Sequence, residues 1–293
     1  MQDRRKRVQR LKKMIIAIVV TLLILPTVFC ILLAVRIGNL EKQIKELKKE
    51  GHKSLEIVWN EEDVIKTATE EEVMEETKEE ENLRKVYLTF DDGPSIYTDE
   101  ILDILKRYNV KATFFVTGMN LPQYSECFQK ILDDGHSLGI HTYSHVYSEV
   151  YSSLEAFQED FYKIRDCIYE STGEDIKIYR FPGGSSNTIV SKQVREDIMK
   201  WLKEENIQYY DWNVSSGDAS STLLSAEKIA ENCLNGIKNR NTEIVLLHDS
   251  GAKKSTVEAL PLIIEGINRL DDTILLPIDE GTVPIQQIRL TEE

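Results

Sequence analysis

Residues 86–94 have the sequence Val86-Tyr87-Leu88-Thr89-Phe90-Asp91-Asp92-Gly93-Pro94, an apolar run that ends in two adjacent acids. The β-branched and aromatic residues predict a strand over 86–90, and Gly-Pro predicts a turn directly after it. In parallel α/β folds the chemistry lies just past the carboxyl ends of the strands. Asp91 and Asp92 are therefore the first candidates for a functional site, although Asp-Asp-Gly-Pro also suits a turn or a helix N-cap.

Short apolar runs alternate with amphipathic helical stretches in the rest of the chain. The predicted strands are 86–90, 112–116, 137–140, 176–181, 207–212, 243–247 and 272–276. The predicted helices are 99–108, 123–134, 154–172, 190–205, 225–239 and 256–270. This alternation predicts βαβ units and an α/β fold with about seven parallel strands, either a nearly closed barrel or an open sheet. The sequence has no G-x-G-x-x-G and no Walker motif, which disfavours the nucleotide-binding folds.

Charged or ligand-type side chains lie at or after the ends of five of these predicted strands. They are Asp91 and Asp92, then His141 and His145, then Arg180, then Asp218, and finally His248. The spacing of His141 and His145 predicts a helical turn with both imidazoles on one face, near enough to share a metal. A chance pair of structural histidines explains that spacing equally well. A carboxylate from Asp91 or Asp92 would complete a His₂-carboxylate site with an open position for water.

Four segments together resemble the polysaccharide deacetylases, also called carbohydrate esterase family 4 or NodB-homology enzymes. The segments are Thr89-Phe90-Asp91-Asp92-Gly93-Pro94, His141-Thr142-x-x-His145, Arg180-Phe181-Pro182-Gly183-Gly184 and Leu246-Leu247-His248-Asp249. The resemblance covers residues 84–277 with the segments in the family's order. It implies a distorted (β/α) barrel with about seven parallel strands, and hydrolysis of N-acetyl groups on an amino-sugar polymer.

The resemblance also implies a role for each matching residue. A divalent metal, usually zinc, with cobalt or another divalent ion as alternatives, would be bound by Asp92, His141 and His145. Asp91 would be the base that takes a proton from the water that the metal activates, and Arg180 would keep that base ionised. The acid that protonates the departing nitrogen would be His248. Asp218 matches the aspartate that orients this acid, and we prefer it to the neighbouring Asp249.

Three further positions are candidates for substrate binding. Leu246 matches a leucine that shapes the pocket for the acetyl methyl group, and Trp212 is expected in the core or in the wall of the groove. Gly183 stands where the family commonly has a tyrosine whose N–H stabilises the oxyanion. Ala219 stands where the fourth motif usually ends in tryptophan. Both departures predict a groove that is more open than usual.

The sequence before the folded domain has three parts. Residues 1–13 form a basic tail, 14–35 are an uncharged run of 22 residues, and 36–84 form a linker with an acidic stretch, so the catalytic domain is expected over 85–293. A bilayer core of about 30 Å needs about 20 apolar residues in a helix, and a signal peptide has a shorter apolar region. We therefore expect an uncleaved transmembrane helix. The positive-inside rule places the N-terminus in the cytoplasm and the catalytic domain outside the cell membrane.

Residues 37–47 contain Ile37, Leu40, Ile44 and Leu47 at heptad spacing. About two heptads are too few for a dependable coiled coil, so this segment is either a weak dimerisation element or a helical extension of the membrane span. The chain of 293 residues has a formal net charge of −14, which argues against nucleic acid as a partner. Cys127, Cys167 and Cys233 lie outside the predicted span, and both a disulfide with one free thiol and three free thiols are compatible with the sequence.

The sequence thus predicts a membrane-anchored, metal-dependent deacetylase whose partner is a cell-wall glycan, most simply peptidoglycan. N-acetylglucosamine and N-acetylmuramic acid are both open as the target sugar, and the widened groove favours the bulkier one. The alternatives are a chitooligosaccharide deacetylase, an O-acetyl esterase of the xylan type, and a catalytically silent glycan-binding protein of the wall. The complete set of polar residues at the strand ends argues against the silent protein.

Overall fold

The computed structural model describes residues 83–121, 123–237 and 240–290. The predicted tail 1–13, the predicted span 14–35 and the segment 37–47 lie outside these residues. Within the described part, none of the helices combines the length and the apolar character that a bilayer crossing requires. The first strand of the described residues, β1, begins at Arg84.

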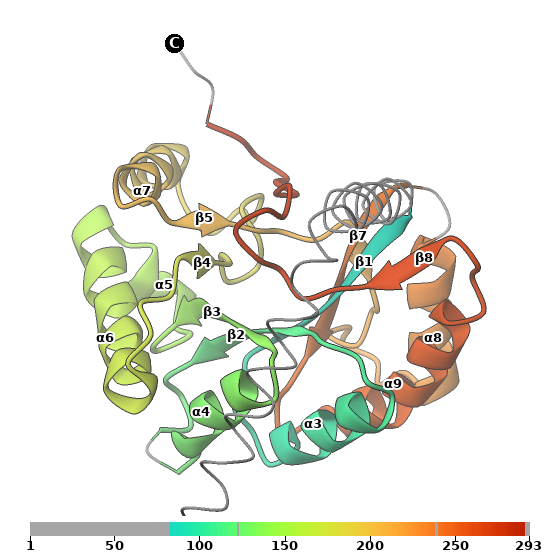
Figure 1. Cartoon of the computed structure of the whole chain (residues 1–293). Helices are drawn as coiled ribbons and strands as arrows, with labels where there is room; N and C mark the ends of the chain where they lie inside the picture. Colours follow the sequence, from blue (N-terminus) through green and yellow to red (C-terminus); the bar gives the residue numbers. More distant parts are fainter. Residues whose placement is uncertain (1–82, 122, 238–239, 291–293) are drawn as a thin grey trace, which may run out of the picture. The chain divides into compact units, whose positions relative to one another are not determined.

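The described residues form a parallel sheet of eight strands that curls into a partial barrel (Figure 1). The strands are β1 (Arg84–Asp91), β2 (Thr113–Thr117), β3 (Ser137–Thr142), β4 (Ile178–Tyr179), β5 (Gln208–Tyr209), β6 (Val214–Ser215), β7 (Thr242–His248) and β8 (Thr273–Leu275). Seven of them follow the order β5-β4-β3-β2-β1-β7-β6, and β8 pairs with the beginning of β1. The α/β class and the parallel sheet are therefore confirmed.

Helices lie around the outside of the curled sheet (Figure 1). They are α3 (Thr98–Arg107), α4 (Glu126–Asp133), α5 (Tyr147–Val150), α6 (Leu154–Thr172), α7 (Lys192–Glu204), α8 (Ala226–Gly236) and α9 (Lys254–Ile267). The helix α6 has the bounds that the sequence predicts. The Ser153 hydroxyl caps its first turn by accepting a hydrogen bond from the Ala156 N–H, and Gly173 ends it with a left-handed φ of 75°.

The alternation of side chains in β1 shows how the fold positions the site. Val86, Leu88 and Phe90 belong to the large core between the sheet and its helices, whereas Tyr87 belongs to a small core on the other face. Successive side chains of a strand point to opposite faces, so Asp91 shares the inner face with Tyr87. The carboxylate at the end of β1 is thereby directed toward the inside of the curled sheet.

The structure differs from the prediction mainly in the second half of the sheet. The segments 176–181 and 207–212 were expected to be strands of six residues, but each contains only two residues in strand geometry. The short strand β6 was not predicted, because two residues at the end of a loop give no periodic signal. The brevity of these strands leaves residues 180–186 and 210–213 as loops at the carboxyl end of the sheet, where they are available to build a site.

Candidate active site

Asp92, His141 and His145 form a compact cluster at the carboxyl end of β1 and β3. The Oδ1 atom of Asp92 lies 3.1 Å from Nε2 of His145 and 3.6 Å from Nε2 of His141. One possible ligand atom from each residue lies within 4.8 Å of the other two. A carboxylate and two imidazoles at such distances form a donor set for a divalent metal ion with positions left for water.

The two histidines do not lie on a helical turn, and that part of the prediction is wrong. His141 is a residue of β3, whereas His145 follows a bend and has a left-handed φ of 55°. Their ring centroids are 5.5 Å apart. The sequence could not show this, because a non-glycine residue at positive φ has no pattern of its own.

Asp160 of α6 holds the bend between the two histidines. Its Oδ1 accepts hydrogen bonds from the Thr142 hydroxyl at 2.5 Å and from the Tyr143 N–H at 2.7 Å. Its Oδ2 accepts the Ser144 N–H at 2.9 Å. No sequence pattern points to this residue, since it lies inside a predicted helix and its three partners are 16 to 18 residues away.

A backbone carbonyl orients the buried imidazole of His141. Its Nδ1 lies 2.7 Å from the carbonyl oxygen of Arg180. A carbonyl can only accept a hydrogen bond, so Nδ1 must carry the proton and Nε2 presents its lone pair to Asp92. Burial lowers the pKa of His141, which favours the neutral form that a metal ligand requires. The observed hydrogen bonding therefore fits a bound divalent cation.

The carboxylate of Asp92 is favoured in its ionised form. Burial opposes ionisation, but the hydrogen bond from His145 and the nearby histidines outweigh it and lower the pKa of Asp92. An ionised carboxylate beside two imidazole nitrogens is the form that binds metal.

The adjacent carboxylate of Asp91 has a different partner. Its Oδ1 forms an ion pair of 2.8 Å with Nη1 of the fully buried Arg180. Its Oδ2 lies 4.0 Å from Nε2 of His141, beside the Asp92–His141–His145 cluster. As the sequence predicts, the two adjacent acids point to different partners.

The guanidinium of Arg180 is itself fixed by several contacts. It donates to the Thr89 hydroxyl at 2.6 Å and to the carbonyl oxygens of Tyr210 at 2.9 Å and Asp211 at 3.2 Å. It also lies over the ring of Phe115, 4.0 Å from the centroid. A buried charge is tolerated only when it is paired and hydrogen-bonded, and here these contacts hold the guanidinium against Asp91.

His248 and Asp218 form a second pair on the far side of Asp91. His248 ends β7 and is the direct register partner of Asp91 on β1. The ring nitrogen Nδ1 of His248 lies 2.7 Å from Oδ1 of Asp218, and the backbone N–H of His248 donates to Oδ2 of Asp218 at 2.9 Å. Asp249 instead accepts hydrogen bonds from the hydroxyls of Ser95 and Thr98 at 2.6 Å each. The preference for Asp218 over Asp249 as the partner of His248 agrees with this geometry.

The Asp218 carboxylate changes the acidity of His248. Burial alone would lower the pKa of His248, but the hydrogen bond to Asp218 and the surrounding carboxylates raise it above its usual value. The hydroxyl of Thr256 donates to Oδ2 of Asp218 at 2.9 Å and helps to hold this carboxylate. With its Nδ1 engaged, His248 can present a protonated Nε2 to a ligand.

The predicted substrate-binding residues lie beside these pairs. Leu246 is two residues before His248 on the same face of β7 and is 7% exposed. Gly183 and Gly184 have left-handed φ values of 75° and 80°. Trp212 is partly exposed, and a Cβ on Gly184 would meet its ring at 3.0 Å. Among the described residues the Gly183 N–H donates to no acceptor, so it is free for a ligand.

The ring of Tyr147 lies beside Gly183. A Cβ on this residue would meet Cε2 of Tyr147 at 3.1 Å and its hydroxyl oxygen at 3.4 Å. The ring of Tyr147 therefore occupies part of the space beside the glycine, and the width of the groove stays a prediction. The sequence did not single out Tyr147, although an aromatic residue two positions after a candidate ligand is a usable signal.

Several residues outside the site have structural positions. His136 accepts the Ala112 N–H at 3.1 Å, and burial lowers its pKa to about 4. Trp201 is 7% exposed in the core. The three thiols of the folded domain are unpaired, namely Cys127, Cys167 and Cys233.

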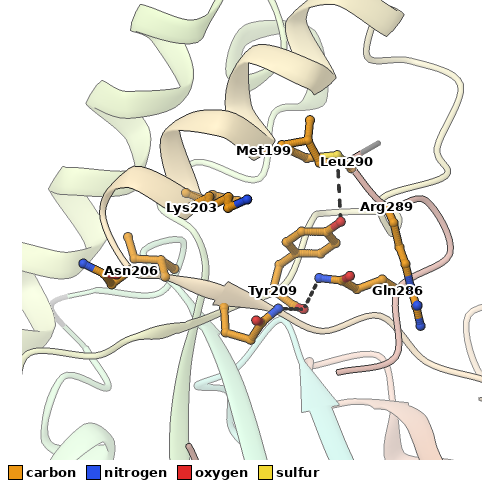
Figure 2. A pocket seen from close by; sticks show the side chains of 10 residues that line it. Met199, Lys203, Asn206, Tyr209, Gln286, Arg289 and Leu290 are labelled. Atoms are coloured by element: carbon orange, nitrogen blue, oxygen red, sulfur yellow. Dashed lines mark hydrogen bonds between the residues drawn. The ribbon is translucent and has the colours of Figure 1, made fainter. Parts of the chain in front are cut away.

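A cavity of about 700 Å³ lies elsewhere, at the edge of the sheet beside α7 and β5 (Figure 2). Its lining includes Met199, Tyr209 and Leu290 and contains no carboxylate, imidazole or thiol. None of the predicted site residues contributes to it.

The curled parallel sheet, the Asp–His–His cluster and the neighbouring Asp91–Arg180 and Asp218–His248 pairs define an α/β protein with a hydrolytic site that can hold a divalent metal. The family profile described as "Polysaccharide deacetylase" matches residues 78–201. Two peptidoglycan-N-acetylglucosamine deacetylases of Bacillus cereus are similar in sequence. One is 34% identical, with 62% of this chain and 63% of the relative covered, and the other is 30% identical, with 72% and 77% covered.

A solved structure is similar over nearly its whole length. The catalytic domain of a peptidoglycan N-acetylglucosamine deacetylase from Eubacterium rectale superposes with a TM-score of 0.66 and 37% identity, covering 72% of this chain and 94% of that domain. This chain belongs to the polysaccharide deacetylase family. It is an N-deacetylase, a hydrolase of carbon–nitrogen bonds.

Proposed function

We propose that this protein removes N-acetyl groups from the N-acetylglucosamine residues of peptidoglycan. The observation that carries the proposal is that the Asp91–Arg180 and Asp218–His248 pairs lie at the same edge of the sheet as the Asp92–His141–His145 cluster. The similar proteins named above are peptidoglycan-N-acetylglucosamine deacetylases, which supports this sugar over N-acetylmuramic acid.

The residues of the chain divide the reaction between them. The acetyl carbon is attacked by water, and Asp91 takes the proton of that water through the carboxylate oxygen that faces His141. His248 donates a proton to the nitrogen, so that the carbon–nitrogen bond breaks and acetate and a free amine are released. The unpaired N–H of Gly183 is placed to donate a hydrogen bond to the developing oxyanion, and Leu246 contacts the acetyl methyl group.

A divalent cation, zinc by preference, would be held by Asp92, His141 and His145 and would supply the Lewis acidity that activates the water and polarises the acetyl carbonyl. The proposed location is outside the cell membrane. A membrane helix over residues 14–35 and a linker over 36–84 would hold the catalytic domain next to the wall polymer, and the segment 37–47 could contribute a weak dimer contact. Immunoblotting of membrane and soluble cell fractions, with a variant that lacks residues 14–35 as the control, tests this location.

Acetate release tests the reaction. The purified protein loaded with Zn²⁺ is incubated with peptidoglycan, chitooligosaccharide and acetylxylan, and each assay is repeated after chelation. We expect release from peptidoglycan that the chelator abolishes, and after muramidase digestion the lost acetyl groups should map to N-acetylglucosamine by mass spectrometry. Release from acetylxylan alone would establish the esterase instead, and no release from any substrate by the folded, metal-loaded protein would overturn the proposal.

A variant with Asp91 changed to Asn tests the assigned base. It should bind metal like the wild type, because Asp92 and the histidines are unchanged, but release acetate at a rate lower by about 10²–10⁴-fold. Full activity in this variant would refute the role of Asp91.

A further inference from the structure

Tyr147 lies at the active site although no sequence motif includes it. It is the first residue of the short helix α5 and follows the ligand His145 by two positions. Its ring lies edge-on to the ring of His145, with 5.1 Å between the centroids. The side chain is only partly buried, so part of the ring remains available to a ligand.

The position of Tyr147 is fixed from two sides. Tyr151, one helical turn later, packs against it with 6.0 Å between the ring centroids. The Tyr151 hydroxyl donates to the carbonyl oxygen of Pro182 at 2.9 Å, which ties α5 to the loop that carries Gly183. A ring held in this way loses little freedom when a ligand packs against it, and this makes it a good binding surface.

The ring also fills the space that a side chain on residue 183 would take. A Cβ there would meet Cε2 of Tyr147 at 3.1 Å, whereas a Cβ on Gly184 would meet the ring of Trp212 at 3.0 Å. Two consecutive glycines are thus flanked by two aromatic rings. The unpaired N–H of Gly183 belongs to this glycine pair, so a group bound to that N–H lies close to both rings.

The order of the strands places Tyr147 opposite the proposed acid. His248 lies at the end of β7, on one side of β1, whereas Tyr147 and Gly183 follow β3 and β4 on the other side. A ligand that reaches from His248 to the Gly183 N–H must therefore extend toward the ring of Tyr147. An amphipathic ring presents an apolar face and a hydroxyl, and a sugar offers C–H groups and hydroxyls in return.

We propose that Tyr147 is a substrate-binding residue that forms one wall of the site for the N-acetylated sugar, with Trp212 as the wall on the other side of the glycine pair. The proposal rests on the proposed function, because it assigns the sugar to the same site. The proposal assigns part of the affinity for the glycan to Tyr147, which lies outside the motifs. The ring of Tyr147 would take the place of a side chain on residue 183.

Direct binding to an inactive protein tests this role. The Asp91→Asn variant is titrated calorimetrically with chitooligosaccharide, and the measurement is repeated after adding Tyr147→Leu, Tyr147→Phe or Tyr169→Leu. Tyr169 is an exposed aromatic residue of α6, 58% exposed, and serves as the matched control. We expect loss of the ring in Tyr147→Leu to weaken binding on the order of tenfold, and both Tyr147→Phe and Tyr169→Leu to stay within about threefold.

Kinetics and metal binding separate this role from a merely structural one. In the otherwise wild-type protein, Tyr147→Leu should raise KM for chitooligosaccharide on the order of tenfold with a smaller change in kcat, and Zn²⁺ affinity should not change. Weaker Zn²⁺ binding with an unchanged KM would show that the ring only supports His145 and would overturn the inference. If the wild type releases acetate but Tyr147→Leu leaves the affinity for the glycan unchanged in the Asp91→Asn background, the inference is also overturned. A wild type that releases no acetate would overturn the proposed function instead.

Discussion

Replacing Asp160 with Asn should weaken metal binding without touching a metal ligand. The carboxylate accepts three hydrogen bonds from the bend between His141 and His145. Asn keeps one acceptor oxygen, and its amide group would face at least one N–H donor. One hydrogen bond to a charged group, about 1.5–3 kcal/mol, is lost, and two others fall to the neutral range, about 1 kcal/mol less each. The bend is then destabilised by about 3.5–5 kcal/mol.

Only part of this loss appears in metal affinity, because the bend also forms without metal and Asp160 is partly exposed. Outer-shell partners of metal ligands typically contribute 10–100-fold in affinity, and we expect a loss in this range. His145 makes the site sensitive, since it must be held at a left-handed φ of 55°. The affinity for Zn²⁺ is measured by competition with a chromogenic chelator, and unfolding of the metal-free protein is followed by circular dichroism.

The matched control is Asp166→Asn, which removes the same charge from an exposed position of α6. It should leave both the metal affinity and the unfolding temperature at wild-type values. Wild-type metal affinity in Asp160→Asn would refute the reasoning, and so would an equal loss in both variants, which would indicate a general effect of charge.

Three further predictions concern acidity and packing. Asp218→Asn should lower the pKa of His248, because the carboxylate that raises it is lost. The alkaline limb of the kcat/KM profile should then move to lower pH, and kcat/KM at pH 8 should fall on the order of hundredfold. An unmoved alkaline limb would contradict the assignment of His248 as the acid. Burial raises the pKa of Glu243 to about 7. The native state therefore binds the proton of this carboxyl group more tightly than the unfolded chain does, and the protein loses stability as pH rises from about 4.5 through 7. Glu243→Gln should flatten the fall in Tm between pH 5 and 8, and an unchanged slope of Tm against pH would contradict this prediction. Gly183→Ala should destabilise the fold by about 1–2 kcal/mol for its left-handed φ, with a further loss from contact with Tyr147 that Tyr147→Ala relieves, as a double-mutant cycle of chemical denaturation would measure.

The residues that sequence reasoning could place are those at the ends of regular elements. Asp91 and His248 end strands whose apolar runs are plain in the sequence, and the parallel sheet brings those ends to one edge. The helix α6 carries a serine cap and a terminal glycine, so both of its bounds follow from local chemistry. The choice of Asp218 over Asp249 follows from the divergence of adjacent side chains on a strand.

The residues that sequence reasoning could not place depend on distant partners or on unusual backbone. Asp160 acts on a bend that only the packing of α6 against β3 brings to it. The spacing of His141 and His145 predicted a helical turn, but in the structure His141 belongs to a strand and His145 has a left-handed backbone. Periodicity in the sequence cannot distinguish a helical turn from a strand followed by a bend. Tyr147 occupies part of the space beside Gly183, and from the sequence alone the missing side chain could only be interpreted as empty space.

Arg180 explains how two adjacent carboxylates take two different roles. Its guanidinium holds one oxygen of Asp91 at 2.8 Å, while its own carbonyl oxygen binds Nδ1 of His141 at 2.7 Å. The side chain of Arg180 thus keeps Asp91 out of the Asp92–His141–His145 cluster, and the main chain of Arg180 turns Nε2 of His141 toward Asp92. Because one buried residue sets both distances, the spacing between the base and the metal ligands cannot relax independently. A lysine at this position would keep the charge and the carbonyl but lose the fork of donors that reaches Asp91 through Nη1 and the carbonyls of Tyr210 and Asp211 through Nε and Nη2, so it should preserve metal binding while lowering kcat.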